Sequence, residues 1–200
     1  MITDVRTATM LADKELGAIH QTMAEMDAAP EYSQGYKAKR LGELEQSAAA
    51  LLDRWAGNVD GIISSAVSLA RRGAAPKPTS PEERTYHATA ALQDIESTNR
   101  DGWLKLYQDA VDKGPDVRKL ELRRLLQPRL DRDEQWQHLK TSTYTDAERA
   151  YVTALKEERA LRGSLEIIRL SLAAREQAHW TPVFDRIEIN ALNAPAMDID

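Results

Sequence analysis

The chain has 200 residues and a formal net charge of -5, from 27 basic and 32 acidic residues. This length is enough for one or two domains with a hydrophobic core, and the lack of cysteine excludes disulfides, thiolate metal sites and thiol nucleophiles. The acidic balance disfavours long-range attraction to nucleic acid or to an anionic membrane surface.

Two long amphipathic helices are predicted over residues 1–73. In both segments apolar residues recur at steps of three and four, which places them on one helical face. Thr3 is the expected N-cap of the first helix and Pro30 its end. The short turn that follows favours an antiparallel pair, so we expect a long α-hairpin. The second helix is longer than the first. The apolar face of its half from Trp55 onward must therefore be covered by later helices or by another chain.

A proline-rich segment over residues 74–80 is predicted to be an extended linker and the clearest internal boundary. Directly after it, Ser80, Pro81 and Glu83 combine an N-cap, a first-turn proline and a capping-box glutamate. This combination predicts that a new helix begins at Pro81.

A cluster of short helices is predicted over residues 81–143. Glycine and proline punctuate this region often, and Pro115 and Pro128 are each expected to open a helix. The expected core of the cluster consists of the large apolar residues Trp103, Leu106, Tyr107, Leu122, Leu125, Leu126, Trp136 and Leu139.

One further long helix is predicted over residues 144–180. Thr145 and Glu148 form a capping box at its start, and an apolar stripe with heptad-like spacing follows. Thr181 and Pro182 are expected to end this helix, because proline disrupts helical hydrogen bonding.

The last residues, 181–200, are predicted to form an extended C-terminal arm. Within it, residues 183–189 read VFDRIEI and alternate with the period of two that is typical of a strand. A lone strand in a helical chain lacks a partner for its backbone hydrogen bonds, so the arm is expected to lie on its own helices or to add to another protein. This arm and the uncovered half of the second helix supply the candidate partner-binding residues Trp55, Val59, Ile62, Val183, Phe184, Ile187 and Ile189.

Together these elements predict an all-α fold. It is expected to be an elongated helical hairpin or bundle with two long helices, a cluster of short helices and an extended C-terminal arm. No signal peptide and no apolar run of membrane-spanning length is recognisable. We therefore expect a protein that is made in the cytoplasm and does not bind a membrane.

Residues that could carry chemistry are few. Glu176 and His179 have the spacing that di-iron bundle proteins use, but such sites need two copies of the motif, so no metal or other cofactor is expected. The basic residues between Arg118 and Arg132 are interleaved with acidic ones, which favours an exposed salt-bridged helix over a nucleic-acid site. No phosphate-binding loop or nucleophile motif is present in the sequence.

Two stretches have a recognisable arrangement of helices and turns. The first, residues 13–55, is a helix, a turn with Pro30, Tyr32 and Tyr36, the basic KAKR, and a long helix rich in Ala, Leu and Glu. The second, residues 103–130, is a short helix led by Trp and Leu, a Gly-Pro turn and a basic helix. Together they resemble small helical head-assembly proteins of tailed bacteriophages that infect actinobacteria. The resemblance implies a virion or assembly role and supplies no catalytic residues.

Three function classes follow from these observations. The first is a non-enzymatic phage structural protein, made in the host bacterial cytoplasm, that binds capsid or connector subunits of the head and is oligomeric in the assembly. The acidic Asp198 and Asp200 favour retention in the virion as a minor capsid or head-associated component over a transient scaffolding role. The second is a host-type helical adaptor or regulator that dimerises through a coiled coil. The third is a helical-bundle enzyme with a metal at Glu176 and His179.

Overall fold

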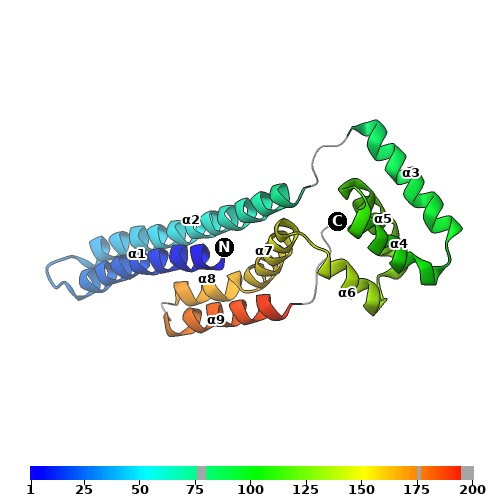
Figure 1. Cartoon of the computed structure of the whole chain (residues 1–200). Helices are drawn as coiled ribbons and strands as arrows, with labels where there is room; N and C mark the ends of the chain where they lie inside the picture. Colours follow the sequence, from blue (N-terminus) through cyan, green and yellow to red (C-terminus); the bar gives the residue numbers. More distant parts are fainter. Residues whose placement is uncertain (76–79, 175–176, 195–200) are drawn as a thin grey trace. The chain divides into compact units, whose positions relative to one another are not determined.

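The computed structural model describes residues 1–75, 80–174 and 177–194, and within them every regular element is an α-helix (Figure 1). The predicted all-α fold is therefore confirmed. The chain forms two compact units. Unit 1 joins Met1–Ala70 to the described residues from Val152 onward, and unit 2 comprises Arg71–Tyr151. The predicted linker residues 76–79 lie outside the described residues.

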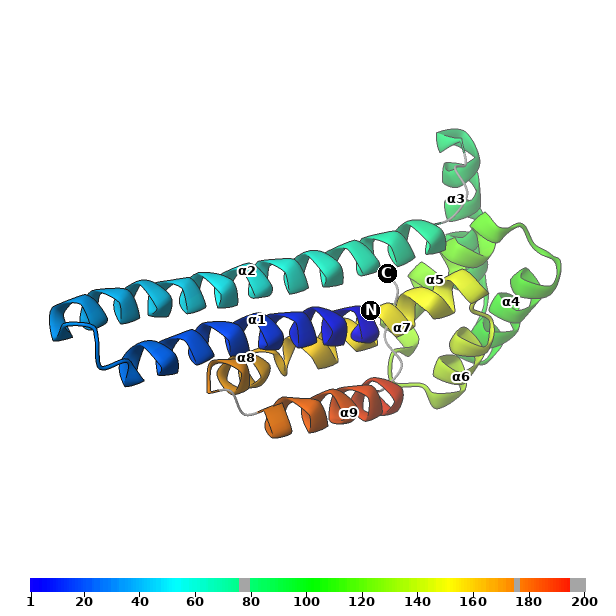
Figure 2. The same cartoon turned by 90° about the vertical axis from the view of Figure 1, so that its left-hand side faces the viewer.

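The predicted α-hairpin is formed by α1 (Ile2–Ala28) and α2 (Gln34–Ala74), which run side by side in opposite directions (Figures 1 and 2). Thr3 lies inside α1 and does not cap it, because the helix already begins at Ile2. The hairpin is closed near its turn by the Lys37 ammonium, which donates to the Asp27 carbonyl at 2.7 Å. Farther along, the Trp55 indole N–H donates to the Thr9 hydroxyl at 3.2 Å.

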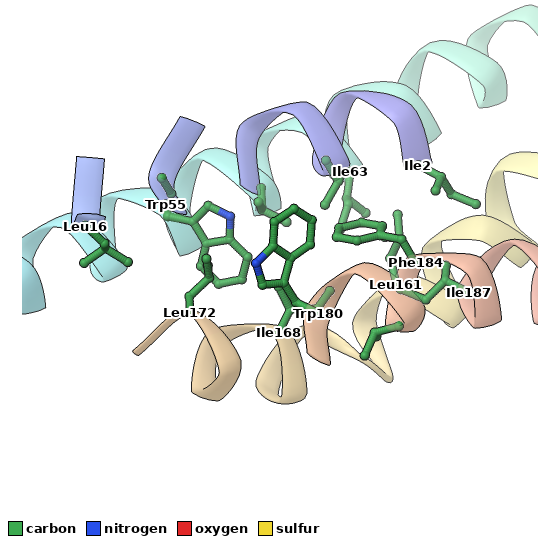
Figure 3. Packing of buried hydrophobic residues seen from close by; sticks show 14 of the residues in the cluster. Ile2, Leu16, Trp55, Ile63, Leu161, Ile168, Leu172, Trp180, Phe184 and Ile187 are labelled. Carbon is green, nitrogen blue, oxygen red and sulfur yellow. The ribbon is translucent and has the colours of Figure 1, made fainter. Parts of the chain in front are cut away.

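Unit 1 is completed by the C-terminal part of α7 (Asp146–Arg162), by α8 (Leu165–Ala173) and by α9 (Gln177–Asn193). Their apolar side chains meet those of the hairpin in one core, where Trp55, Trp180 and Phe184 lie between the helices (Figure 3). The Trp180 and Phe184 rings pack edge to face with centroids 5.9 Å apart. The chain therefore supplies cover for its own long helices.

The single long helix predicted over residues 144–180 is wrong, because α7 ends at Arg162 and α8 begins at Leu165. Gly163 and Ser164 form the turn between them, and the Ser164 N–H donates to the Leu161 carbonyl, three residues earlier. Glycine is one of the weakest helix formers, so a break is least costly at this position.

The strand predicted over residues 183–189 is also wrong, because this stretch belongs to α9. Trp180, Val183, Phe184, Ile187 and Ala191 are buried and follow one another at helical steps of three, one, three and four. A proline inside a helix costs about 3 kcal/mol, whereas each large apolar side chain that is buried contributes about 1.5–3 kcal/mol. Burial of this face therefore outweighs the cost of Pro182, and the helix continues through it. Of the predicted extended arm, residues 195–200 lie outside the described residues.

Unit 2 contains the predicted cluster of short helices: α3 (Pro81–Ser97), α4 (Arg100–Lys113), α5 (Asp116–Leu130), α6 (Glu134–Ser142) and the first turns of α7. Its core is centred on Tyr107, Leu122, Leu126 and Trp136, four of the eight predicted core residues. Trp103, Leu125 and Leu139 pack against them while remaining partly exposed.

Helix starts in unit 2 follow the capping signals of the sequence. The Ser80 hydroxyl accepts the Glu83 N–H at 3.1 Å, which confirms the predicted start of α3. Pro128, which we predicted to open a helix, lies instead inside α5, and Asp133 caps α6 by accepting the Trp136 N–H at 3.1 Å. Burial of Leu126 and Leu130 on either side of Pro128 holds α5 together past the proline.

None of the helices in the described part of the chain combines the length with the apolar character that crossing a membrane requires.

Candidate functional site

Two open surface grooves lie among the described residues of unit 1. The first, the hairpin groove, has a volume of about 480 Å³ and lies between α1 and α2. Small side chains on α1, Ala8 and Ala12, face Trp55 and Leu51 on α2, while Leu11 stands exposed at the edge. Trp55 and Leu51 are nearly inaccessible, so Leu11 and Ala8 supply most of the exposed apolar surface of the groove. The remaining lining residues are Glu15, Arg54 and Asn58.

One ion pair spans the hairpin groove. The Arg54 guanidinium lies 2.6 Å from the Glu15 carboxylate, and both side chains are exposed. An exposed pair of this kind contributes only about 0–1 kcal/mol to stability, so a binding partner can re-pair either charge at little cost.

The second groove, the α9 groove, has a volume of about 340 Å³ and is formed by α7, α9 and the start of α1. Ile2 and Ala191 supply apolar surface, and Leu192 lies beside them with 82% of its surface exposed. The rim is polar and is made by Thr153, Lys156, Glu157 and Glu188. An apolar centre inside a polar rim is the usual anatomy of a protein–protein interface.

A third exposed apolar feature, the α8 ridge, is formed by Ile167 and Leu170. Their neighbours Ile168 and Leu172 point into the core, so α8 is apolar on both its inner and its outer face. Glu166 and Arg169 flank the ridge, and Arg169 lies 3.1 Å from Asp53 on α2. The outer face of a surface helix is normally polar, and a helix that is apolar on every face is normally buried. Exposed apolar residues on the outer face of α8 are therefore unusual.

Most of the predicted partner-binding residues lie in the core of unit 1. Trp55, Val59, Val183, Phe184 and Ile187 are buried against the chain's own helices. The expectation that these five present an uncovered surface is therefore wrong, because α7, α8 and α9 cover Trp55 and Val59 of the hairpin, and the hairpin and α8 cover the three residues of α9. The other two are Ile62, which is partly buried against the same core, and Ile189, which is exposed on α9.

Sequence reasoning missed all three exposed features. A signal for the α8 ridge was present, because LEIIRLSLAA places apolar residues on more than one helical face. The two grooves had no such signal, since each depends on which helices of the folded chain are neighbours.

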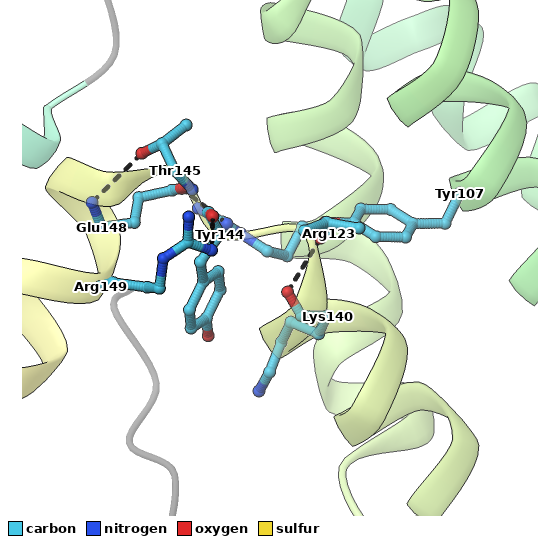
Figure 4. A network of polar contacts seen from close by, with 8 residues as sticks. Tyr107, Arg123, Lys140, Tyr144, Thr145, Glu148 and Arg149 are labelled. Atoms are coloured by element: carbon cyan, nitrogen blue, oxygen red, sulfur yellow. Dashed lines mark hydrogen bonds and ion pairs between the residues drawn. The ribbon is translucent and has the colours of Figure 1, made fainter.

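Unit 2 contains a buried polar network around Arg123 (Figure 4). Its guanidinium donates to the Glu148 carboxylate at 2.7 Å, and both side chains are nearly inaccessible, at 7% and 5% exposure. The same guanidinium lies 5.4 Å from the centre of the Tyr144 ring. Nearby, the Tyr107 and Thr143 hydroxyls are hydrogen bonded at 3.0 Å.

Glu148 has two roles in this network. One carboxylate oxygen accepts from Arg123, and the other accepts the Thr145 N–H at 2.7 Å while the Glu148 N–H donates to the Thr145 hydroxyl at 3.2 Å. The predicted capping box at the start of α7 is thus confirmed. Because the partners of Glu148 fix α7 onto α5, we interpret the network as a structural clamp.

The clamp makes stability depend on pH. Burial acting alone raises the pKa of Glu148, but the Thr145 N–H and Arg123 outweigh it and hold the pKa below the ordinary value of 4.5. A carboxyl whose pKa is lowered by folding stabilises the protein above its unfolded-state pKa, and that contribution is lost as the pH falls through its folded-state pKa. We expect the free energy of unfolding to decline over this acidic range.

Urea unfolding of the intact chain and of Glu148→Gln at several pH values checks this expectation. The stability difference between the two proteins should be largest near neutral pH and should shrink below pH 4.5. A difference that stays constant down to strongly acidic pH would show that Glu148 does not titrate with a lowered pKa.

Of the basic residues that raised the question of nucleic acid, Arg118, Arg123 and Arg124 are paired with acidic side chains in unit 2. Arg118 pairs with Asp94, and Arg124 lies 3.0 Å from Glu121. This arrangement agrees with a salt-bridged helix face. No group of three potential metal ligands occurs among the residues whose positions are described, and Glu176 and the His179 side chain lie outside them.

No model of a known protein family, no curated protein and no solved structure matches this chain.

Proposed function

We propose that this chain is a non-enzymatic structural protein of a phage head that binds capsid or connector subunits through the α9 groove. The phage assignment rests on the resemblance of residues 13–55 and 103–130 to head-assembly proteins of actinobacterial phages. The binding surface rests on the geometry of unit 1. The proposal keeps Ile189 as a partner-binding residue and replaces the buried members of the predicted set.

The observation that carries the proposal is the exposure of Leu192 beside an open apolar groove. Ile189, one helical turn earlier, is exposed on a neighbouring face of α9. Large apolar side chains that gather beside a concave site mark a surface where proteins bind, because their transfer out of water drives association.

Polar groups around the α9 groove can set the orientation of the partner. Lys156 supplies a positive charge, and Glu157 and Glu188 supply negative ones. Charges at a rim contribute more to association rate and specificity than to affinity, whereas the apolar centre supplies most of the binding energy.

Binding of the chain to isolated capsid and connector subunits tests this proposal. Replacing Leu192 by Glu should weaken binding at least about tenfold, or roughly 1.4 kcal/mol, because a charge would enter the apolar centre. Met10→Glu is the matched control: Met10 is an exposed apolar residue of the same unit, at 56% exposure, that does not line the α9 groove. Equal binding by both variants, or no binding by the unaltered chain, would contradict the proposal.

Mass spectrometry of purified particles tests the phage assignment separately. A structural component of the head should be present in mature particles, whereas a scaffold should be present only in precursor particles. Absence from both kinds of particle would contradict any role in the head.

A further inference from the structure

We infer that the hairpin groove binds the α8 ridge of a second copy of this chain. The groove is a concave surface with the nearly buried Leu51 and Trp55 at its base and the exposed Leu11 at its edge, and the ridge is a convex surface made by Ile167 and Leu170. Both features belong to unit 1, so each copy carries one groove and one ridge. This inference is independent of the proposed partner at the α9 groove.

The two surfaces agree in size and polarity. The open groove has a volume of about 480 Å³, which is enough to receive the side chains of Ile167 and Leu170. The side chains of Ala8 and Ala12 on one wall of the groove are small, so a helix can approach α1 closely. Because the Trp55 N–H is satisfied by Thr9, the apolar ridge leaves no new buried donor there.

The charges at the two surfaces are complementary. The groove carries Arg54 and Glu15 in contact with each other, and the ridge is flanked by Glu166 and by Arg169, which lies 3.1 Å from Asp53 of its own chain. Arg169 and Asp53 are both exposed, so Arg169 can exchange this partner at little cost. Docking that sets Glu166 against Arg54 and Arg169 against Glu15 produces a cluster of four alternating charges. A docking position that brought like charges together would be disfavoured. These two pairs therefore also determine how the α8 ridge is aligned along the groove.

A contact between two different surfaces is heterologous, and it has a recognisable consequence. Each copy that docks its ridge still offers an empty groove, so association continues into a ring or an open chain instead of stopping at a dimer. The average mass in solution should therefore rise beyond that of a dimer as the protein concentration increases.

Mixing two disabled variants gives the sharpest test. Leu11→Glu disables the groove and Leu170→Glu disables the ridge, and both positions are exposed, so each variant should fold. We expect each variant alone to be a monomer in sedimentation experiments. The mixture should form a one-to-one dimer that grows no further, because only one intact ridge and one intact groove remain. Met10→Glu, next to Leu11 and outside the groove, should assemble like the unaltered chain.

A charge exchange tests the register without relying on the leucine variants. Arg54→Glu and Glu166→Arg should each weaken association at least about tenfold, and one chain that carries both should recover most of it. Recovery in the double variant separates a direct contact from a loss of fold, which circular dichroism would also reveal.

Three results of the association experiments would overturn the inference. The unaltered chain could stay monomeric at every concentration, the mixture of disabled variants could stay monomeric, or assembly could persist in both single leucine variants. Binding of capsid or connector subunits that is lost in Leu11→Glu and kept in Leu192→Glu would assign the hairpin groove to those subunits and equally refute docking of a second copy. Failure of the Leu192→Glu prediction, in contrast, would affect only the proposed partner at the α9 groove.

Discussion

Replacing Phe184 by alanine is expected to destabilise unit 1 by about 3–5 kcal/mol, the usual cost of removing a buried aromatic ring. Phe184 is fully buried, packs against Trp180 and has the Arg6 guanidinium 5.4 Å from the centre of its ring. The cavity left behind is lined by rigid helices that cannot close over it completely. Denaturant unfolding followed by circular dichroism measures the loss.

Ile189→Ala is the matched control for Phe184→Ala. Ile189 lies on the same helix with 55% of its surface exposed, so its truncation should change the free energy of unfolding by less than about 0.5 kcal/mol. An extended arm that is free of the chain's own core would give small effects at both positions. A small effect at Phe184 would therefore contradict the packing of α9.

Replacing Glu148 by alanine is expected to destabilise unit 2 by about 3–5 kcal/mol. The substitution leaves the Arg123 guanidinium buried without its carboxylate and also removes the capping box that begins α7. A buried charge without a partner has lost its hydration and gains no compensating attraction, which is why breaking such a pair costs more than the pair itself contributes. Denaturant unfolding of the intact chain measures the effect.

Two further variants identify the cause of that loss. Glu43→Ala breaks an Arg–Glu pair of 2.6 Å whose side chains are both 46% exposed, and it should cost no more than about 0.5 kcal/mol. Arg123→Met combined with Glu148→Ala should recover most of the stability, since it removes the stranded charge. If Glu43→Ala and Glu148→Ala had equal effects, burial would not be the source of the cost.

Local signals in the sequence predicted most of the helical framework correctly. The hairpin followed from two stripes of apolar residues and a short turn between them. The starts of α3 and α7 followed from Ser80 with Glu83 and from Thr145 with Glu148, because a capping box is a short-range pattern whose partners are three residues apart. Such contacts need no knowledge of the rest of the fold.

The alternating stretch in α9 shows where a short window fails. Val183 and Ile187 fit both a period of two and a helical period, so seven residues could not separate a strand from a helix. The deciding residues are Trp180, Phe184 and Ala191, which extend the helical stripe beyond that window and are all buried. The expected stop at Pro182 then excluded Trp180 from the pattern, although packing was strong enough to carry the helix through the proline.

The candidate surfaces could be predicted only in small part. Ile189 was expected to bind a partner and is exposed. The expected role of the Trp55 face required that no other part of the chain cover it. This face is covered by α8 and α9, whose contacts with the hairpin join residues more than one hundred positions apart. A groove is defined by such distant neighbours, so a sequence pattern along one helix does not contain it.

The α9 groove exists only if α9 packs within unit 1 of a single molecule, and the core beneath the hairpin groove and the α8 ridge includes Trp180, Val183 and Phe184 of α9. Amide hydrogen exchange over residues 183–191, measured on dilute isolated protein, tests this packing most directly. We expect slow exchange at the amides of this segment, because helical hydrogen bonds in a buried element open rarely. Rapid exchange there, slowed only when another protein is added, would show that the segment is unfolded by itself and would contradict the structure on which both proposed interfaces depend.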